Sequence, residues 1–166
     1  MILYIANELS RKNGWAVIYY YTVRGAAAAG HNVSVVTDRN AQNESITGVA
    51  VYPALASFYD GYFKCFRVQA DAYRMRRLIS FSDYDLIHVL VEPYLPVLSF
   101  LPRKKTVLSI VGTYAVAPFR KWPNKFLYHF ALKKVSSIIA ISEYTARHFA
   151  PYNSAQAPVR VIPLGV

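Results

Sequence analysis

Short runs rich in β-branched residues alternate with longer, helix-like segments along nearly the whole chain, and this alternation limits the folds it can adopt. The strand-like runs cover residues 2–6, 32–37, 47–52, 85–90, 106–111, 137–141 and 159–163. The helix-like segments cover residues 15–29, 57–80, 94–101, 124–134 and 143–149, with Pro96 interrupting the third. Strands joined by helices form right-handed crossovers and parallel sheets covered on both faces. The pattern therefore predicts an α/β fold with a Rossmann-like, doubly wound parallel sheet.

The length of the chain fits one such domain. Its 166 residues match the usual size of about 100–200 residues for a single domain. Although 54% of the residues are hydrophobic, no apolar run approaches the roughly 20 residues that a membrane-spanning helix needs. Residues 1–6 read directly as a strand and lack the basic region of a signal peptide. Because Cys65 is the lone cysteine, we expect a cytoplasmic domain without an internal disulfide or a cysteine-based metal cluster.

Doubly wound sheets bind ligands at the carboxyl ends of their strands, so the loops after the strands hold the candidate binding residues. Asn13 and Gly14 stand just before the first helix. Glycine allows a ligand to approach the backbone, and a helix N-terminus offers unpaired N–H groups to a phosphate or carboxylate. A plain turn at Asn13-Gly14 is the alternative.

Two further loops carry polar groups at strand ends. Gly112 and Thr113 follow the fifth strand and would offer backbone N–H groups and a hydroxyl to a ligand, or simply end the strand in a turn. Ser142 stands at a helix N-cap position, with Glu143 in the first turn and Thr145 at the third helical position. Helix capping alone would explain Ser142 and Glu143. The candidate substrate-binding residues are Asn13, Gly14, Gly112, Thr113, Ser142 and Glu143.

Other chemistry is poorly supported by the sequence. His88 and Glu92 have a spacing that binds metals on a helix, but they straddle a strand end and a loop, which favours a buried, hydrogen-bonded histidine over a metal ligand. The G-x-G-x-x-G fingerprint and the GK[ST] phosphate loop are absent, which disfavours dehydrogenases and nucleoside triphosphatases. No catalytic residue and no metal site can be named from residue spacing.

The net charge of +10 is unevenly distributed, because no acidic residue occurs between Glu92 and Glu143. Aromatic residues interleave with the basic residues of that stretch and of residues 64–77. Such a surface suits an anionic membrane, and a solvated basic face is the alternative. Without a recognition helix, zinc-ligand spacing or an RNP-like strand, we expect no specific binding of nucleic acid.

Five segments carry a family resemblance when they are taken together. They are the loop Asn13-Gly14 and residues 27–37, 85–88, 138–144 and 161–166. In this order they resemble the N-terminal domain of a family 4 (group 1) glycosyltransferase with the GT-B fold. The resemblance implies that residues 1–166 form the acceptor-side Rossmann-like domain and that the C-terminal domain binding the nucleotide-sugar donor is absent. It also implies transfer in the cleft between the two domains, with retention of anomeric configuration.

The resemblance sets further expectations. The candidate residues would make backbone and hydroxyl hydrogen bonds to the acceptor or to the donor phosphate, with no cofactor besides the nucleotide-sugar co-substrate. The acceptor would be a glycan or a lipid-linked or other envelope molecule, reached by peripheral contact with the inner face of the membrane. Two positions depart from the family pattern: Asn13 replaces a frequent glycine, and Val111 replaces a frequent histidine.

These expectations leave two functions open. The first is the acceptor-binding half of a retaining glycosyltransferase that is inactive in isolation. The second is a non-catalytic Rossmann-like module that binds a glycan, a nucleotide or an anionic membrane surface. Val111 favours the second, because valine can neither hydrogen-bond a sugar hydroxyl nor assist proton transfer.

Overall fold

A single parallel sheet forms the centre of the molecule in a computed structural model that describes residues 1–12, 14–57, 65–112, 115–120 and 124–163. Its seven strands lie in the order β3-β2-β1-β4-β5-β6-β7. They are β1 (Ile2–Ile5), β2 (Val33–Asp38), β3 (Val49–Leu55), β4 (Leu86–Val89), β5 (Lys105–Ile110), β6 (Ser137–Ala140) and β7 (Val159–Val161). The predicted doubly wound parallel sheet is thereby confirmed.

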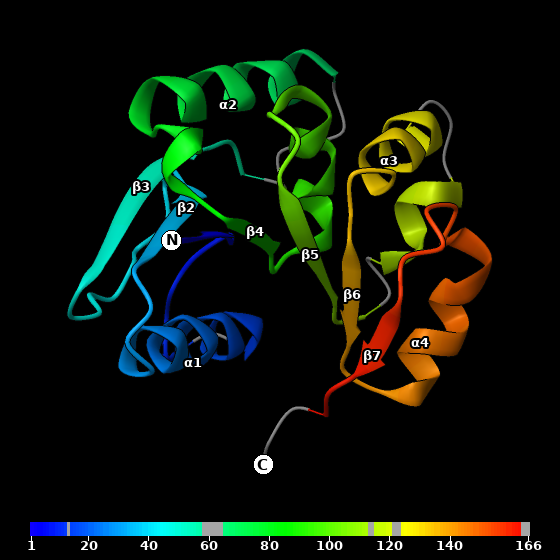
Figure 1. Cartoon of the computed structure of the whole chain (residues 1–166), viewed down its shortest axis with the longest axis horizontal. Helices are drawn as coiled ribbons and strands as arrows, with labels where there is room; N and C mark the ends of the chain where they lie inside the picture. The colour runs from blue at the N-terminus through cyan, green and yellow to red at the C-terminus, as the bar shows by residue number, and fades with distance from the viewer. Residues whose placement is uncertain (13, 58–64, 113–114, 121–123, 164–166) are drawn as a thin grey trace.

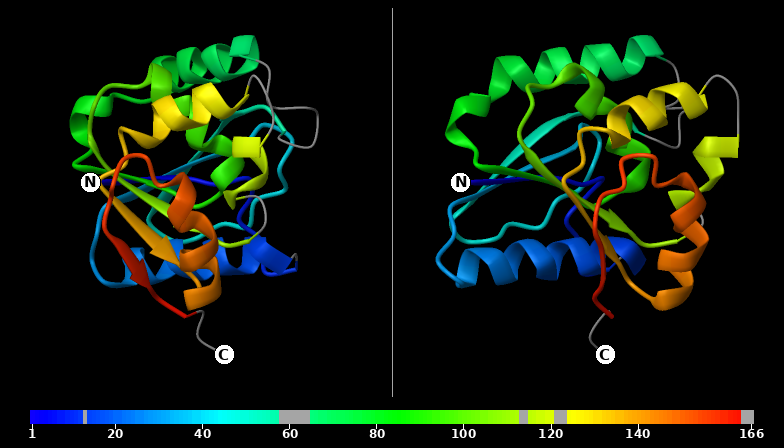
Figure 2. Two further views of the ribbon diagram at one scale, coloured as in Figure 1. Left: turned by 90° about the vertical axis from the view of Figure 1, so that its right-hand side faces the viewer. Right: turned by 45° about the vertical axis from the view of Figure 1, so that its right-hand side comes forward.

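Helices cover both faces of the sheet (Figures 1 and 2). The α-helices are α1 (Gly14–Ala28), α2 (Cys65–Leu78), α3 (Asn124–Leu132) and α4 (Glu143–Phe149). Short 3-10 helices are η2 (Phe81–Asp83), η3 (Glu92–Phe100), η5 (Ala117–Arg120) and η6 (Ala150–Tyr152). Helix α1 lies on one side of the sheet, while α2 and α3 lie on the other. Helix α4 joins the α3 side through Phe119, whose ring contacts both Tyr128 of α3 and Phe149 of α4.

The chain changes direction across the sheet between β1 and β4. From β1 it runs outward to β2 and β3, and it then returns to β4 on the other side of β1. The register places Ile5 of β1 opposite both Val36 of β2 and Val89 of β4. Connections that leave β1 and β4 therefore diverge to opposite faces of the sheet, and folds of this kind bind ligands at such a point.

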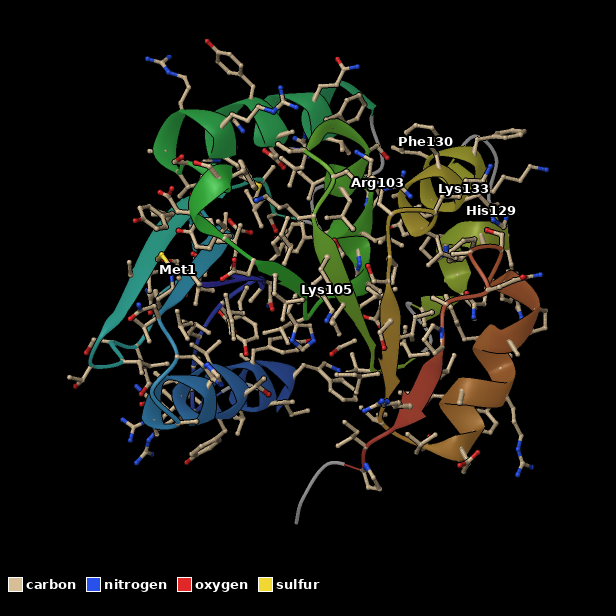
Figure 3. All side chains as sticks on the ribbon, viewed as in Figure 1. Met1, Arg103, Lys105, His129, Phe130 and Lys133 are labelled. Carbon is tan, nitrogen blue, oxygen red and sulfur yellow. The ribbon has the colours of Figure 1, made fainter. Side chains whose placement is uncertain are left out.

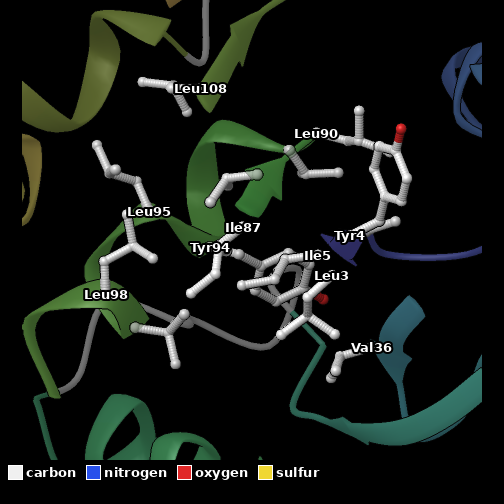
Figure 4. Packing of buried hydrophobic residues seen from close by; sticks show 14 of the residues in the cluster. Leu3, Tyr4, Ile5, Val36, Ile87, Leu90, Tyr94, Leu95, Leu98 and Leu108 are labelled. Atoms are coloured by element: carbon white, nitrogen blue, oxygen red, sulfur yellow. The ribbon is translucent and has the colours of Figure 1, made fainter. Parts of the chain in front are cut away.

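The core lies between the sheet and η3 (Figure 4). Leu3, Ile87 and Leu108 of the strands are fully or almost fully buried, as are Tyr94 and Leu98 of η3. Burying a Leu or Ile side chain stabilises a fold by about 1.5–3 kcal/mol relative to leaving it exposed. This packing fixes the strands that carry the carboxyl edge of the sheet.

The segment predicted as a short helix over residues 94–101 is a 3-10 helix that begins earlier, at Glu92. Pro96 accounts for the irregular geometry, because it lacks an N–H donor and cannot continue a regular α-helix, whereas Pro93 stands in the first turn, where proline is tolerated. The Tyr94 hydroxyl donates to the Ala56 carbonyl at 3.2 Å. The Tyr128 hydroxyl donates to the Pro93 carbonyl at 3.2 Å. Both bonds tie η3 to its neighbours.

Other element boundaries follow from local chemistry. Strand β3 extends to Leu55, beyond the predicted end at residue 52, and tolerates Pro53 because it is an edge strand. Gly30 has a φ of 85° and follows α1, as expected for a helix C-cap. Of the helix predicted over residues 57–80, the structure describes α2 from Cys65 to Leu78. Within the described residues, no helix combines the length and the apolar character needed to cross a bilayer.

Candidate functional site

The carboxyl ends of β1, β4, β5 and β6 meet at one edge of the sheet. The register joins them in steps: Ile5 lies opposite Val89, Val89 opposite Leu108, and Ile110 opposite Ala140. The residues that follow these strands, and the first residue of α1, therefore face a common edge. Of the predicted site residues, Gly14, Gly112, Ser142 and Glu143 lie at this edge, while Asn13 and Thr113 fall outside the described residues.

Gly14 is the first residue of α1 and is exposed. A Cβ atom built at Gly14 has no described neighbouring atom within 4 Å. The start of α1 thus borders open space, and the first N–H groups of a helix have no partner within the helix. This end of α1 can donate hydrogen bonds to an anionic or hydroxyl-bearing ligand.

Gly112 follows β5 and is half-buried. It too has no described atom within 4 Å of an added Cβ. Among the described residues, open space therefore lies where a side chain at Gly112 would begin. Gly112 consequently keeps that space clear.

Glu92 holds the end of β5 in place. Its side chain is only 3% exposed, and its Oε1 accepts a hydrogen bond from the Val111 N–H at 2.6 Å. The Gly112 N–H also donates to this carboxyl group. Burial raises the pKa of Glu92 to about 7, although the backbone hydrogen bonds favour its charged form. The carboxyl group thus fixes two backbone donors just before the candidate residues of this loop.

Sequence reasoning considered Glu92 only as a metal partner for His88 and missed this role. The signal was present: Glu92 is the one charged residue in the largely apolar segment 89–101. A carboxyl group in such a segment must find hydrogen-bond donors, because an unpaired buried charge is costly.

His88 is a buried, hydrogen-bonded histidine, as predicted. Its Nε2 lies 2.9 Å from the Ser109 Oγ, and its ring centroid is 5.3 Å from that of Tyr4. Burial lowers the pKa of His88 to about 4. Among the described residues, no three His, Cys, Asp or Glu side chains gather as a metal site would require.

Ser142 caps α4. Its Oγ accepts a hydrogen bond from the Thr145 N–H at 3.1 Å and lies 3.0 Å from the Thr145 Oγ1. Glu143 is exposed in the first turn of α4, where a negative charge interacts favourably with the helix dipole. The capping role that the sequence left open for Ser142 is thereby confirmed.

Asn7 adds a polar group that the sequence did not single out. It lies two residues after the end of β1, and its Oδ1 is buried without a hydrogen-bond partner among the described residues. The backbone of Asn7 is fixed, because its carbonyl accepts from the Asp38 N–H at 3.0 Å. A buried amide oxygen without a partner is unusual.

The loop after β1 is tied to the connection between β2 and β3. Asn43 accepts from the Leu9 N–H at 2.9 Å. Glu44 accepts from both the backbone N–H and the Nε of Arg11, each at 2.6 Å. These hydrogen bonds from Arg11 lower the pKa of Glu44. They hold residues 9–11 against a neighbouring loop and so position the approach to α1.

The sequence profile of glycosyltransferase family 4 matches residues 12–166. The chain belongs to glycosyltransferase family 4. Gly14, Glu92, Gly112 and Ser142 all lie inside the matched region of this family 4 domain, whereas Asn7 precedes it. No curated protein sequence matches the chain.

Solved structures of GT-B glycosyltransferases share the fold of the family 4 domain. Sucrose-phosphate synthase from Thermosynechococcus elongatus superposes with a TM-score of 0.74 at 13% identity, over 99% of this chain and 48% of that protein. HepE from Anabaena, solved in complex with UDP and glucose, superposes with a TM-score of 0.65 at 17% identity, over 99% of this chain and 44% of HepE. The family 4 domain thus spans about half the length of each of these two proteins.

Proposed function

We propose that this family 4 domain is the acceptor-binding half of a retaining glycosyltransferase, with its cleft at the carboxyl edge of the sheet. The observation that carries the proposal is the family match over residues 12–166 together with coverage of about half of two GT-B proteins. A second, donor-binding domain would face this edge and close the cleft. Without that domain, residues 1–166 would transfer no sugar.

The roles of the edge residues follow from what each can donate or accept. The N-terminus of α1 at Gly14 would bind a phosphate or hydroxyl group through backbone N–H groups. Gly112 would leave room for the sugar, and Asn13 and Thr113 would add polar groups beside them. Because Ser142 is occupied by its capping bond, it and the exposed Glu143 would contact ligand only at the rim.

The donor would be a nucleotide sugar, bound mainly by the second domain and used as a co-substrate without another cofactor. The HepE structure in complex with UDP and glucose supports a nucleotide sugar of this class. Donor identity and retention of configuration belong to the complete enzyme. The domain itself would orient the acceptor hydroxyl toward the donor.

A non-catalytic binding module is the second candidate, and Val111 favours it. Val111 stands where the family frequently has a histidine, and its buried side chain offers no group for proton transfer. Glu92 is a poor substitute for that histidine, because its Oε1 already accepts the Val111 N–H. Such a module would use the same edge to bind a glycan or nucleotide without transferring it.

The acceptor would be a glycan, a lipid-linked molecule or another envelope component. A lipid-linked acceptor would require peripheral contact with the cytoplasmic face of a membrane. The positive charge of the chain supports that location.

Substitution of Gly112 tests the position of the cleft. Gly112→Val would place a branched side chain in open space, so the fold is expected to persist while acceptor access is blocked. In the longer enzyme that includes the donor domain, we expect the acceptor KM to rise at least about tenfold and donor KM to change little, because a 1.4 kcal/mol loss of binding is a tenfold effect. Gly25→Val, which also meets open space but lies on α1 away from the edge, is the matched control. Unchanged acceptor kinetics in Gly112→Val would contradict this placement.

A further inference from the structure

The outward face of α3 carries large apolar side chains where a solvent-facing helix normally carries polar ones. Tyr128, Ala131 and Leu132 are buried against the rest of the domain. Phe126 and Phe130, one helical turn apart on the outward side, are 61% and 57% exposed. Lys125 and Lys133 are also exposed and stand on either side of these two rings in the sequence. Figure 3 shows Phe130 and Lys133 on the outer side of α3.

A group of cations lies between α3 and α2. The Lys134 Nζ donates to the carbonyls of Ser99 and Leu101 at 3.2 and 2.7 Å, and Arg76 of α2 donates to the Phe100 carbonyl at 2.5 Å. These bonds satisfy carbonyl groups at the end of η3. Burial and the nearby positive charges of Arg76 and Arg103 lower the pKa of Lys134. Cations have therefore been brought close enough here to repel one another.

This positive charge has little neutralisation within the domain. No acidic residue occurs from residue 93 to residue 142, a stretch that supplies most of η3 and all of β5 and α3. Within the described residues, no carboxylate forms a salt bridge with Arg76, Arg103 or Lys133. The one described ion pair on α2 joins Arg74 to the buried Asp71.

A shallow groove lies between α2 and the end of η3. It has a volume of about 310 Å³ and is lined by Tyr73 and Arg76 of α2 and by Phe100 and Leu101 at the end of η3. Tyr73 is 62% exposed. We call these exposed side chains of α2, the end of η3 and α3 the α2–α3 face. Its members are Tyr73, Arg76, Arg103, Lys125, Phe126, Phe130 and Lys133.

We infer that the α2–α3 face docks on an anionic lipid bilayer, with Phe126 and Phe130 entering the interface between headgroups and acyl chains. Exposed aromatic residues flanked by Lys and Arg are the surface chemistry that such a bilayer attracts. A solvated basic face would explain the cations, but it would not explain two phenylalanines exposed together on one helix. An anionic lipid surface would attract the cations of the α2–α3 face and bury its exposed aromatic rings.

The position of this face agrees with the proposed function. Helices α2 and α3 cover one side of the sheet (Figure 2), whereas the candidate cleft lies at the edge where the strands end. Docking through the α2–α3 face would leave that edge accessible to a second domain and to an acceptor at the membrane. The inference names the membrane partner of the proposed function, but vesicle binding itself requires no sugar transfer.

Cosedimentation with vesicles tests the inference. The purified protein is mixed with vesicles of phosphatidylcholine alone or of phosphatidylcholine with phosphatidylglycerol. We expect binding to the anionic vesicles only, and Lys125→Gln/Lys133→Gln should weaken it about 20-fold, because each cation near an anionic surface contributes appreciably. Phe126→Ala/Phe130→Ala should weaken it about tenfold or more, through loss of apolar burial in the interface.

Matched variants separate this face from general charge and general hydrophobicity. Arg24→Gln/Arg160→Gln removes two exposed cations elsewhere, and Tyr21→Ala/Tyr144→Ala removes two exposed aromatic rings elsewhere. Each control should change binding less than about threefold, since the screened field of a distant charge is weak. Equal binding of the native protein to both vesicle types would overturn the inference. So would control variants that bind anionic vesicles as weakly as the variants of the α2–α3 face. Tight binding to duplex DNA without binding to vesicles would overturn it as well.

Vesicle binding and sugar transfer can fail separately. A protein that binds anionic vesicles but transfers no sugar in its complete form would retain this inference and contradict the proposed function. A complete enzyme that glycosylates a soluble acceptor but does not bind anionic vesicles would support the proposed function and contradict this inference.

Discussion

Glu92 determines the geometry of the candidate site at the scale of a single residue. Its carboxyl group accepts the Val111 N–H just where β5 ends, and Gly112 follows immediately. The energetic cost of this arrangement is burial of an acid in an apolar environment, which raises the pKa from 4.5 to about 7. The folded domain therefore binds a proton at Glu92 more tightly than the unfolded chain does.

Replacement of Glu92 by Gln should reduce the pH dependence of stability. Because the folded pKa lies above the unfolded one, the stability that protonated Glu92 contributes is complete below about pH 4.5 and is lost as pH rises to about 7. The free energy of unfolding lost in this way is on the order of a few kcal/mol. Urea unfolding at pH 5 and pH 8 should show a smaller difference in Glu92→Gln than in the native protein. Glu143→Gln, at an exposed position, should leave the native difference intact, and an equal difference in all three proteins would refute the role of Glu92.

Asn7 and Glu92 also show where residue-level prediction from the sequence ends. Gly14 and Gly112 were predicted at the carboxyl edge of the sheet, because residues that follow parallel strands lie at that edge. A buried carboxyl that accepts backbone N–H groups depends on where two neighbouring strands end in space, and the sequence does not state this. The unpaired Oδ1 of Asn7 is likewise a consequence of three-dimensional packing.

At the scale of elements, the sequence predicted the strands and helices well where one local signal dominated. Helix α4 was predicted at its observed bounds, since Ser142 and Glu143 form a strong N-terminal signal. The short helix predicted after β4 is present, but it begins at Glu92 rather than at residue 94 and has 3-10 geometry around the interrupting Pro96. Helix α3 ends at Leu132, earlier than predicted, and Lys134 instead donates to carbonyls at the end of η3.

The cap of α4 gives a direct test at this scale. Ser142→Ala removes the Oγ that accepts the Thr145 N–H, and loss of such a cap costs about 0.5–2 kcal/mol. Thermal unfolding should show a correspondingly lower Tm. Ser80 occupies the N-cap position of η2 without a side-chain capping bond, so Ser80→Ala should have an effect within about 0.5 kcal/mol. Equal losses in both variants would show that the Ser142 cap contributes nothing.

At the scale of the whole molecule, the domain carries two surfaces that differ in chemistry. Its sheet is covered on both faces, yet Gly14 and Gly112 at the carboxyl edge border open space. The α2–α3 face adds a second, separate surface with its own chemistry. The two surfaces would let one domain hold an acceptor at a membrane and present it to a donor.

The most direct test compares the chain of residues 1–166 with a longer protein that also contains a donor domain. Both are incubated with a panel of nucleotide sugars, and sugar transfer or hydrolysis is measured. The proposed function predicts turnover by the longer protein and none by residues 1–166 alone. Turnover by residues 1–166, or none by a folded longer protein under any of these conditions, would contradict it.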